Sequence, residues 1–456
     1  MAPRSLARAL SAVLVPIPLA GCDSVSPPSR TTTTVPAPAA QTASVTPEAI
    51  PSADHVNPTT SPDRPDDPGE RCAADKASAR QNPPQFSPDS VFNQPASCLG
   101  VRADSAAWSR RWFDNANLPG RTDPSQRGRI TVSFDAYSTP IYYTDDATTT
   151  IRVYIASWGW PSNVSDGDSI PWNPDWQPAA GSDMEMVIID RATGRQWGLW
   201  GVQKVNWSTC LTLGNLFAGY RGGTDLCAGQ VSLGTNPDGS IADLVHSSGY
   251  SGAGQRGMGN LLATALLPTL DEIEKGSIEH VVNMETYGTM FGPACTPAQV
   301  NTAAAGVDCG YAEAPATRLE WYSGPAASCG ASAQANTPEA RAKTVPEGMR
   351  FRLNLTDAQV ESWLDRRGFT GAKRRTARIF ATAFRKYGWV ISDTTCWDSA
   401  MAVEGIANPS ARRRWADLGI ASPTSDGATL LDGLITSADQ VETLNPPTPG
   451  RLTNAT

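Results

Sequence analysis

The sequence predicts a mainly β fold, an antiparallel β-sandwich of the jelly-roll kind with a few helices at its edges. Short segments that alternate polar and apolar residues occur along most of the chain, the pattern of strands with one buried face. Helical spacing of apolar residues is clear in two segments of the C-terminal third. These observations favour a strand-rich domain over a helical one.

The expected strands follow one another in chain order. The clearest segments are 129–134, 151–155, 184–189, 195–200, 350–355 and 389–393. Between the third and the fourth, Asp190-Arg191-Ala192-Thr193-Gly194 has the composition of a tight turn. We therefore expect these two strands to form a hairpin.

Two helices are expected between the last two strands. Thr356 is followed three residues later by Gln359, the spacing of a capping box, which predicts a helix to about Arg367. The second helix ends at Gly388, a residue suited to a helix C-terminus. Its buried stripe consists of Ile379, Phe380, Ala383, Phe384 and Tyr387.

Composition excludes some classes of function. The chain has 456 residues, 37 Lys and Arg against 45 Asp and Glu, and a net charge of −8. Nucleic-acid binding needs a basic footprint, so we expect none. The three histidines, at 55, 246 and 280, cannot form a three-histidine zinc site if His55 lies in a linker. We expect no metal, no cofactor and a monomeric protein.

The N-terminus predicts export. Arg4 and Arg8 precede an apolar stretch that ends in Leu19-Ala20-Gly21-Cys22, which resembles a bacterial lipoprotein signal peptide. The resemblance implies cleavage after residue 21, lipid on Cys22 and anchoring at the extracellular face of the cell membrane. Residues 22–71 are rich in Ser, Thr and Pro and predict a disordered stalk. Residues 72–444 would form the folded domain, and 445–456 a disordered tail.

The cysteines fit an oxidising compartment. Apart from Cys22 there are eight, an even number, and no C-x-x-C pair. We expect four disulfide bonds. Eight cysteines allow 105 connectivities. Pairing of sequence neighbours has the lowest entropic cost of loop closure. These pairs are Cys72 with Cys98, Cys210 with Cys227, Cys295 with Cys309 and Cys329 with Cys396.

Tryptophans are dense between residues 158 and 207. Indole rings present flat apolar faces that stack on sugar rings in many secreted proteins. Trp158 and Trp160 lie in the most loop-like surroundings, and together with Trp200 they are our candidates for a carbohydrate groove. The alternative is that most of these tryptophans fill the core.

Ionisable residues suggest an acid/base site. Asp183 and Glu185 alternate along an expected strand, so both could project from one face, and paired carboxylates catalyse glycosidic cleavage. His280 is a third candidate for catalysis. Arg350 and Asp393 lie in apolar strands, where a charge is costly unless paired or functional. Two solvated acids, a core histidine and an Arg350–Asp393 ion pair are the structural alternatives.

Two nearby motifs are weak. Gly252-Ala253-Gly254-Gln255-Arg256-Gly257 matches a dinucleotide-binding pattern, but no strand signal precedes it. Gly249-Tyr250-Ser251-Gly252-Ala253 lacks the last glycine of a nucleophile elbow. A serine hydrolase that uses Ser251 and His246 is therefore the weakest of three hypotheses.

Five segments together resemble an uncharacterised family of secreted actinobacterial lipoproteins without an established activity. They are 86–95, 182–190, 274–282, 346–353 and 385–393, and they include Gly-x-Ile-x-His and Tyr-Gly-x-x-x-x-Asp motifs. In that family a histidine usually stands at the position of Glu185 and another at that of Thr296, whereas His280 is retained. The resemblance implies an inactive or repurposed relative if those histidines were essential.

The sequence thus predicts a lipid-anchored extracellular protein that acts on polysaccharide. The leading hypothesis is a glycoside hydrolase or polysaccharide lyase, in which Asp183, Glu185, His280 and Asp393 are catalytic. Arg350 and Trp158, Trp160 and Trp200 would bind the glycan. The alternative is a glycan-binding or structural cell-envelope lipoprotein without catalysis.

Overall fold

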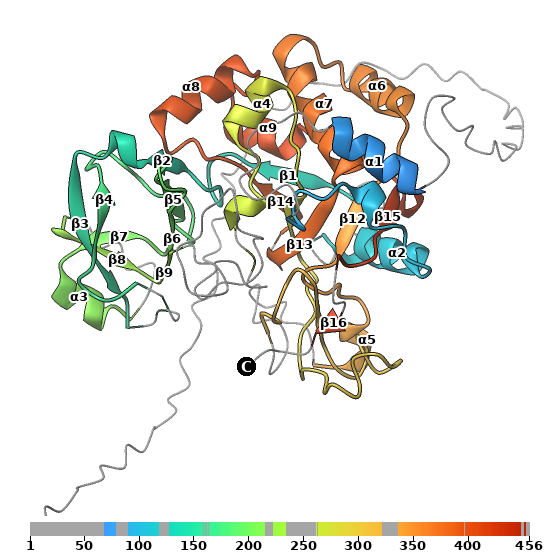
Figure 1. The fold of residues 1–456 in the computed structure, drawn as a ribbon, viewed down its shortest axis with the longest axis horizontal. Coiled ribbons are helices and arrows are strands. Elements are labelled where there is room, and N and C mark those ends of the chain that lie inside the picture. The colour runs from blue at the N-terminus through green and yellow to red at the C-terminus, as the bar shows by residue number, and fades with distance from the viewer. Residues whose placement is uncertain are drawn as a thin grey trace, which may run out of the picture.

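A computed structural model gives the architecture in Figure 1. It describes residues 68–78, 90–117, 127–157, 159, 162, 164–214, 222–233, 261, 263–321, 336–395, 397–447 and 451–452. Cys22, Trp158, Trp160, His246, Ser251, Cys329 and Cys396 therefore lie outside the described residues, as does the glycine motif at 252–257.

The central element is a mixed six-stranded sheet. Its strands, in spatial order, are β1 (Ile130–Ser133), β14 (Ser399–Ala402), β10 (Val282–Thr286), β13 (Trp389–Thr394), β12 (Arg350–Leu353) and β15 (Val441–Thr443). The pairs β1–β14 and β10–β13 are parallel, and the others are antiparallel.

Smaller sheets form the other part of the molecule, at the left of Figure 1. One consists of β2 (Ile141–Tyr143), β5 (Met186–Ile189), β6 (Gln196–Trp200) and β9 (Gln230–Leu233). Another consists of β4 (Ser169–Trp172), β3 (Thr149–Ile155), β8 (Asp225–Ala228) and β7 (Gln203–Val205). These two enclose one apolar core. A short pair, β11 (Ala312–Glu313) with β16 (Arg451–Leu452), lies apart from them.

The described residues also form helices. They are α1 (Pro68–Ser78), α2 (Ser105–Asn115), α3 (Trp207–Thr212), α4 (Leu270–Lys275), α5 (Pro338–Arg341), α6 (Asp357–Arg366), α7 (Gly371–Lys386), α8 (Pro409–Asp417) and α9 (Pro423–Thr429). Helix α3 packs against β3 and β8 of the smaller sheets. Helices α2, α4, α6, α7 and α8 share one large core with one face of the sheet. Trp389 lies at its centre, with ring centroids 5.1 Å from Trp112 and 5.2 Å from Phe384.

The prediction of a strand-rich fold is confirmed, but a single antiparallel sandwich is not what the described residues form. Each of the three larger sheets contains a parallel pair, and helices cover the central one. A half-buried strand shows the same alternation whether its neighbour is parallel or antiparallel, so the pattern could not decide this point. α1 begins inside the segment predicted as a stalk, and β16 lies in the predicted tail.

Several local predictions are confirmed. Strands β5 and β6 form the expected hairpin. Helix α6 has the capping box, in which the Gln359 N–H donates to Thr356 Oγ1 at 3.2 Å. Gly388 follows α7 with a φ of +77°, and a Cβ there would lie 2.0 Å from the carbonyl oxygen of Phe351. Only glycine fits that conformation and that contact.

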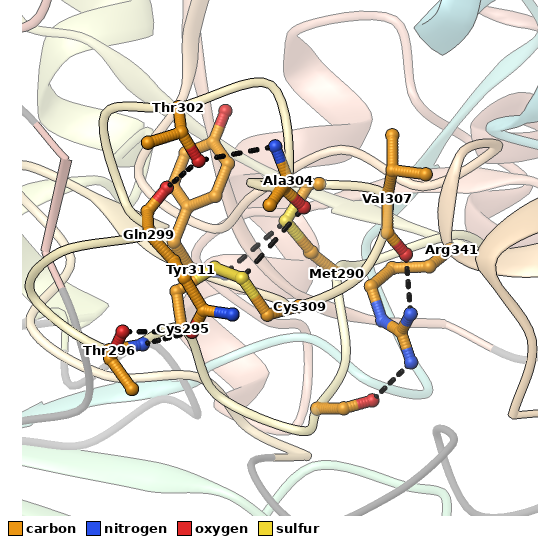
Figure 2. The surroundings of a disulfide bond; sticks show 12 residues. Met290, Cys295, Thr296, Gln299, Thr302, Ala304, Val307, Cys309, Tyr311 and Arg341 are labelled. Atoms are coloured by element: carbon orange, nitrogen blue, oxygen red, sulfur yellow. Dashed lines mark hydrogen bonds between the residues drawn. A yellow bond between two sulfur atoms is a disulfide. The ribbon is translucent and has the colours of Figure 1, made fainter.

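Three of the four expected disulfide bonds are present. They join Cys72 with Cys98, Cys210 with Cys227 and Cys295 with Cys309. Figure 2 shows the third, in a loop region where the buried Arg341 donates to the carbonyl oxygen of Val307. Thr296 lies beside this bond and contacts Gln299.

Candidate active site

Two cavities meet at the carboxyl ends of strands β10 and β13. The larger has a volume of about 370 Å³ and the smaller about 50 Å³. Glu285 lines both of them. The neighbouring residues Asp393 and Thr394 line the smaller and the larger cavity, respectively. The two cavities are therefore treated as one site, the acidic cleft.

The central sheet fixes the floor of the acidic cleft. Strand registers place Thr131 opposite Ala400, Ala400 opposite Glu285 and Glu285 opposite Asp393. These residues form one row across β1, β14, β10 and β13. Since neighbouring strands lie about 4.8 Å apart, Glu285 and Asp393 are adjacent carboxylates. The register shifts between Met284 and Glu285, an irregularity of the kind often found beside functional sites.

The opposite wall comes from the segment before β5. Asp183 lines the larger cavity and Glu185 the smaller, where Thr139 Oγ1 donates to Glu185 Oε2 at 3.0 Å. The prediction that both acids alternate on one strand face is wrong, because β5 begins only at Met186. Met184, between them, has a φ of +42°. This left-handed residue directs the two acids to different cavities, at a cost of about 1–3 kcal/mol.

Asp393 is held in a hydrogen-bonded setting. The Thr394 N–H donates to Asp393 Oδ1 at 2.7 Å, and a bond of this kind favours the ionised carboxylate. Glu320 and Glu347 lie close enough to feel its charge. Burial first, and then the Asp393 charge, raise the pKa of both glutamates well above the usual value. Burial and the neighbouring Asp393 thus favour the neutral form of both glutamates.

An exposed indole lies at the larger cavity. Trp397 is 55% exposed and lines it together with Asp135, Asp183 and Asp398. Trp200, in contrast, lies in β6 and does not line either cavity. Trp172, Trp176 and Trp197 are buried, so the core alternative is confirmed for these three.

His280 lies away from the acidic cleft, before the opposite end of β10. It is 6% exposed, its Nδ1 lies 2.8 Å from the carbonyl oxygen of Val281, and its Nε2 lies 3.2 Å from Glu272 Oε1. Burial alone would lower the pKa of His280, but the Glu272 carboxylate raises it above the usual 6.5. Burial would raise the pKa of Glu272, and His280 lowers it. This geometry describes a buried ion pair between α4 and the sheet.

Replacement of His280 by glutamine should therefore destabilise the fold by about 3 kcal/mol, since it leaves the largely buried Glu272 carboxylate without its charged partner. The raised His280 pKa means that its stabilisation is complete below about pH 6.5 and is lost as the pH rises through the folded value. Glu272 adds stability above about pH 4.5, which is lost as the pH falls through its lowered value. Urea unfolding at pH 6 and pH 9 measures this effect. An equal loss at both values would contradict the ion pair.

Arg350 is buried in β12, where Val390 of β13 is its register partner, and it does not line either cavity. Its guanidinium donates to the carbonyl oxygens of Val91, Gln94 and Tyr387, at 3.2, 2.6 and 2.9 Å. Carbonyl oxygens therefore satisfy the Arg350 guanidinium, in place of the ion pair with Asp393 that was one of our alternatives. It holds the segment before η1 (Ala96–Cys98) against the end of α7.

Glu285 and Trp397 line the acidic cleft but were not predicted from the sequence. Glu285 carried a usable signal, because Val281-Val282-Asn283-Met284-Glu285 places polar residues at alternate positions of an apolar strand. The side-chain amide of Asn283 donates to the carbonyl oxygens of Leu266 and Ala402, at 3.0 and 2.9 Å, and so has a structural role. Trp397 stands outside the tryptophan-dense region and had no comparable signal.

Comparison with known proteins adds no assignment. No protein-family model, curated protein or solved structure matches the chain. Within the described residues, side chains of His, Cys, Asp and Glu form no group of three or more that could hold a metal ion.

Proposed function

We propose that the acidic cleft binds a glycan chain and hydrolyses its glycosidic bonds. The observation that carries this proposal is the sheet register, which makes Glu285 and Asp393 neighbours at the floor of a cavity. Two carboxyl groups beside one bond are what most glycosidases use. Asp183 and Glu185, on the facing wall, would bind sugar hydroxyl groups.

The adjacent pair suits a retaining mechanism. Retaining enzymes have carboxyl groups about 5 Å apart, and inverting enzymes more than about 6.5 Å. In this mechanism Glu285 donates its proton to the leaving oxygen while Asp393 attacks the anomeric carbon and the glycosidic bond breaks. Water then attacks the glycosyl ester, Glu285 takes a proton from it, and Asp393 leaves as the carboxylate.

The charge of the acidic cleft favours hydrolysis over the lyase alternative. Six acids line it: Asp135, Asp183, Glu185, Glu285, Asp393 and Asp398. Their field repels the uronate chains that lyases cleave, and it attracts protonated amines. The exposed Trp397 ring can stack on a sugar and interact with an ammonium group. Glycans that are neutral or carry free amines are therefore the preferred substrates.

A screen against amine-bearing, neutral and uronate oligosaccharides of equal length tests this function. We expect new reducing ends from the first two classes, with Trp397→Ala raising KM about tenfold because a stacked ring is worth about 1–2 kcal/mol. Trp207→Ala, which removes another exposed indole, is the matched control and should not change KM. Unsaturated products would indicate a lyase, and binding without turnover would indicate the glycan-binding alternative.

We also propose that the chain is anchored to the outer face of the cell membrane through lipid on Cys22. The signal-like N-terminus supports this location, and the three disulfide bonds fit an oxidising compartment. Among the residues that the structure describes, no helix is long and apolar enough to cross a membrane. Metabolic labelling with a fatty acid, compared between the wild type and Cys22→Ala, tests the proposal.

A further inference from the structure

Behind Asp393 lies a second group of acids that the proposed mechanism does not use. Glu347 is 0% exposed, and its Oε2 accepts a hydrogen bond from the Glu320 N–H at 3.0 Å. Its Oε1 is buried and has no hydrogen-bond partner among the described residues. A carboxylate in that position would lack compensation, so the geometry favours the neutral acid.

The backbone holds Glu347 firmly in this place. The Glu313 N–H donates to the Glu347 carbonyl oxygen, and the Gly348 N–H donates to that of Ile391, both at 2.8 Å. Gly348 has a φ of +86°, and a Cβ there would lie 1.5 Å from the Glu313 carbonyl oxygen. The loop before β12 is therefore fixed against β13, two residues before Asp393.

Thr394 connects this acid pair to the acidic cleft. Thr394 Oγ1 donates to Glu320 Oε2, and the hydroxyl group of Thr289 contacts that of Thr394. Thr394 also donates its N–H to Asp393. A change of charge on Glu320 would thus act directly on the residue that holds Asp393.

We propose that Glu347 and Glu320 are positioning residues that stay protonated behind Asp393 and keep it the ionised acid of the site. This proposal rests on the proposed function for its catalytic consequence. Glu347 is fully buried and Glu320 and Asp393 lie beside it, and three carboxyl groups so close together cannot all ionise near neutral pH. Two other charged groups lie near this cluster. Glu285 is the neighbour of Asp393 in the sheet. The Arg318 charge lowers the pKa of Glu347, but burial and the Asp393 charge raise it by more.

The dependence of unfolding on pH tests the protonated pair without any substrate. In the unfolded chain Glu347 ionises above about pH 4.5, the usual glutamate value, whereas in the native protein it keeps its proton. The wild type should therefore lose stability as the pH rises above this value. Glu347→Gln mimics the neutral acid, so it should not show this loss. We expect the folding constants of the two proteins to diverge by up to about tenfold per pH unit over that range.

Two further variants, one in the cluster and one control on the surface, complete this test. Glu320→Gln should diverge from the wild type in the same direction, whereas Glu70→Gln, at an exposed helix position, should parallel it. If both cluster variants parallel the wild type from pH 4 to pH 9, the proposal is overturned, whether or not glycan is cleaved. Divergence confirms that the pair is protonated.

The pH profile of glycan cleavage tests the consequence for Asp393. Glu347→Gln should keep the acidic limb of kcat/KM and move the alkaline limb, since it removes a group that ionises at high pH. An unchanged alkaline limb would contradict the positioning role. If the wild type cleaves no glycan but the unfolding curves diverge, the proposed function fails and the protonated pair stands.

Discussion

Replacement of Glu285 by glutamine is expected to lower kcat for glycan cleavage about 1,000-fold with little change in KM. Glutamine has the same shape but cannot give its proton to the leaving group, and general acid catalysis contributes about 100- to 10,000-fold. Initial rates of reducing-end release measure the loss. The variant should bind oligosaccharide as the wild type does, since the walls of the acidic cleft are unchanged.

Glu185→Gln is the matched control for this substitution. Glu185 lines the same small cavity but lies on the facing wall, bonded to Thr139. We expect a loss of about tenfold, the magnitude of one hydrogen bond to substrate. Equal losses in the two variants would contradict the distinct role that we give to Glu285, and unchanged rates in both would place catalysis elsewhere.

Arg350→Met should reduce the free energy of unfolding by about 4 kcal/mol, because three carbonyl oxygens would lose a buried charged donor. They belong to Val91, Gln94 and Tyr387. Urea unfolding measures the loss, and hydrogen exchange should show that residues 90–95 open first. Residual cleavage per folded molecule should stay normal.

The control for this substitution lies two residues along the same strand. Arg352 pairs with Glu442 at 2.6 Å, with both side chains partly exposed, and Arg352→Met should cost less than about 1 kcal/mol. If Arg350→Met kept full stability and raised KM instead, the substrate-binding role predicted from sequence would be correct.

Features set by neighbouring residues could be predicted from the sequence. The capping box at Thr356, the glycine after α7 and the β5–β6 hairpin depend on contacts within a few residues. The disulfide bond between Cys295 and Cys309 closes a short loop, which favours neighbour pairing. In each case local chemistry leaves one favourable arrangement.

Features set by distant contacts could not be predicted. The partner of β10 is β13, more than a hundred residues later, and alternation does not encode that choice. Asp183 and Glu185 looked like a strand pair because the left-handed conformation of Met184 has no signature in the sequence. Asp393, a candidate from the sequence, lines the acidic cleft, but its neighbour Glu285 becomes visible only through the sheet register.

The anomeric configuration of the first product tests the central claim most directly. Proton NMR of an oligosaccharide of known linkage, recorded during cleavage by the wild type, distinguishes the two stereochemical outcomes. Adjacent Glu285 and Asp393 carboxyl groups predict that the first product keeps the configuration of the substrate. An inverted product, or no product from amine-bearing and neutral glycans, would contradict the account.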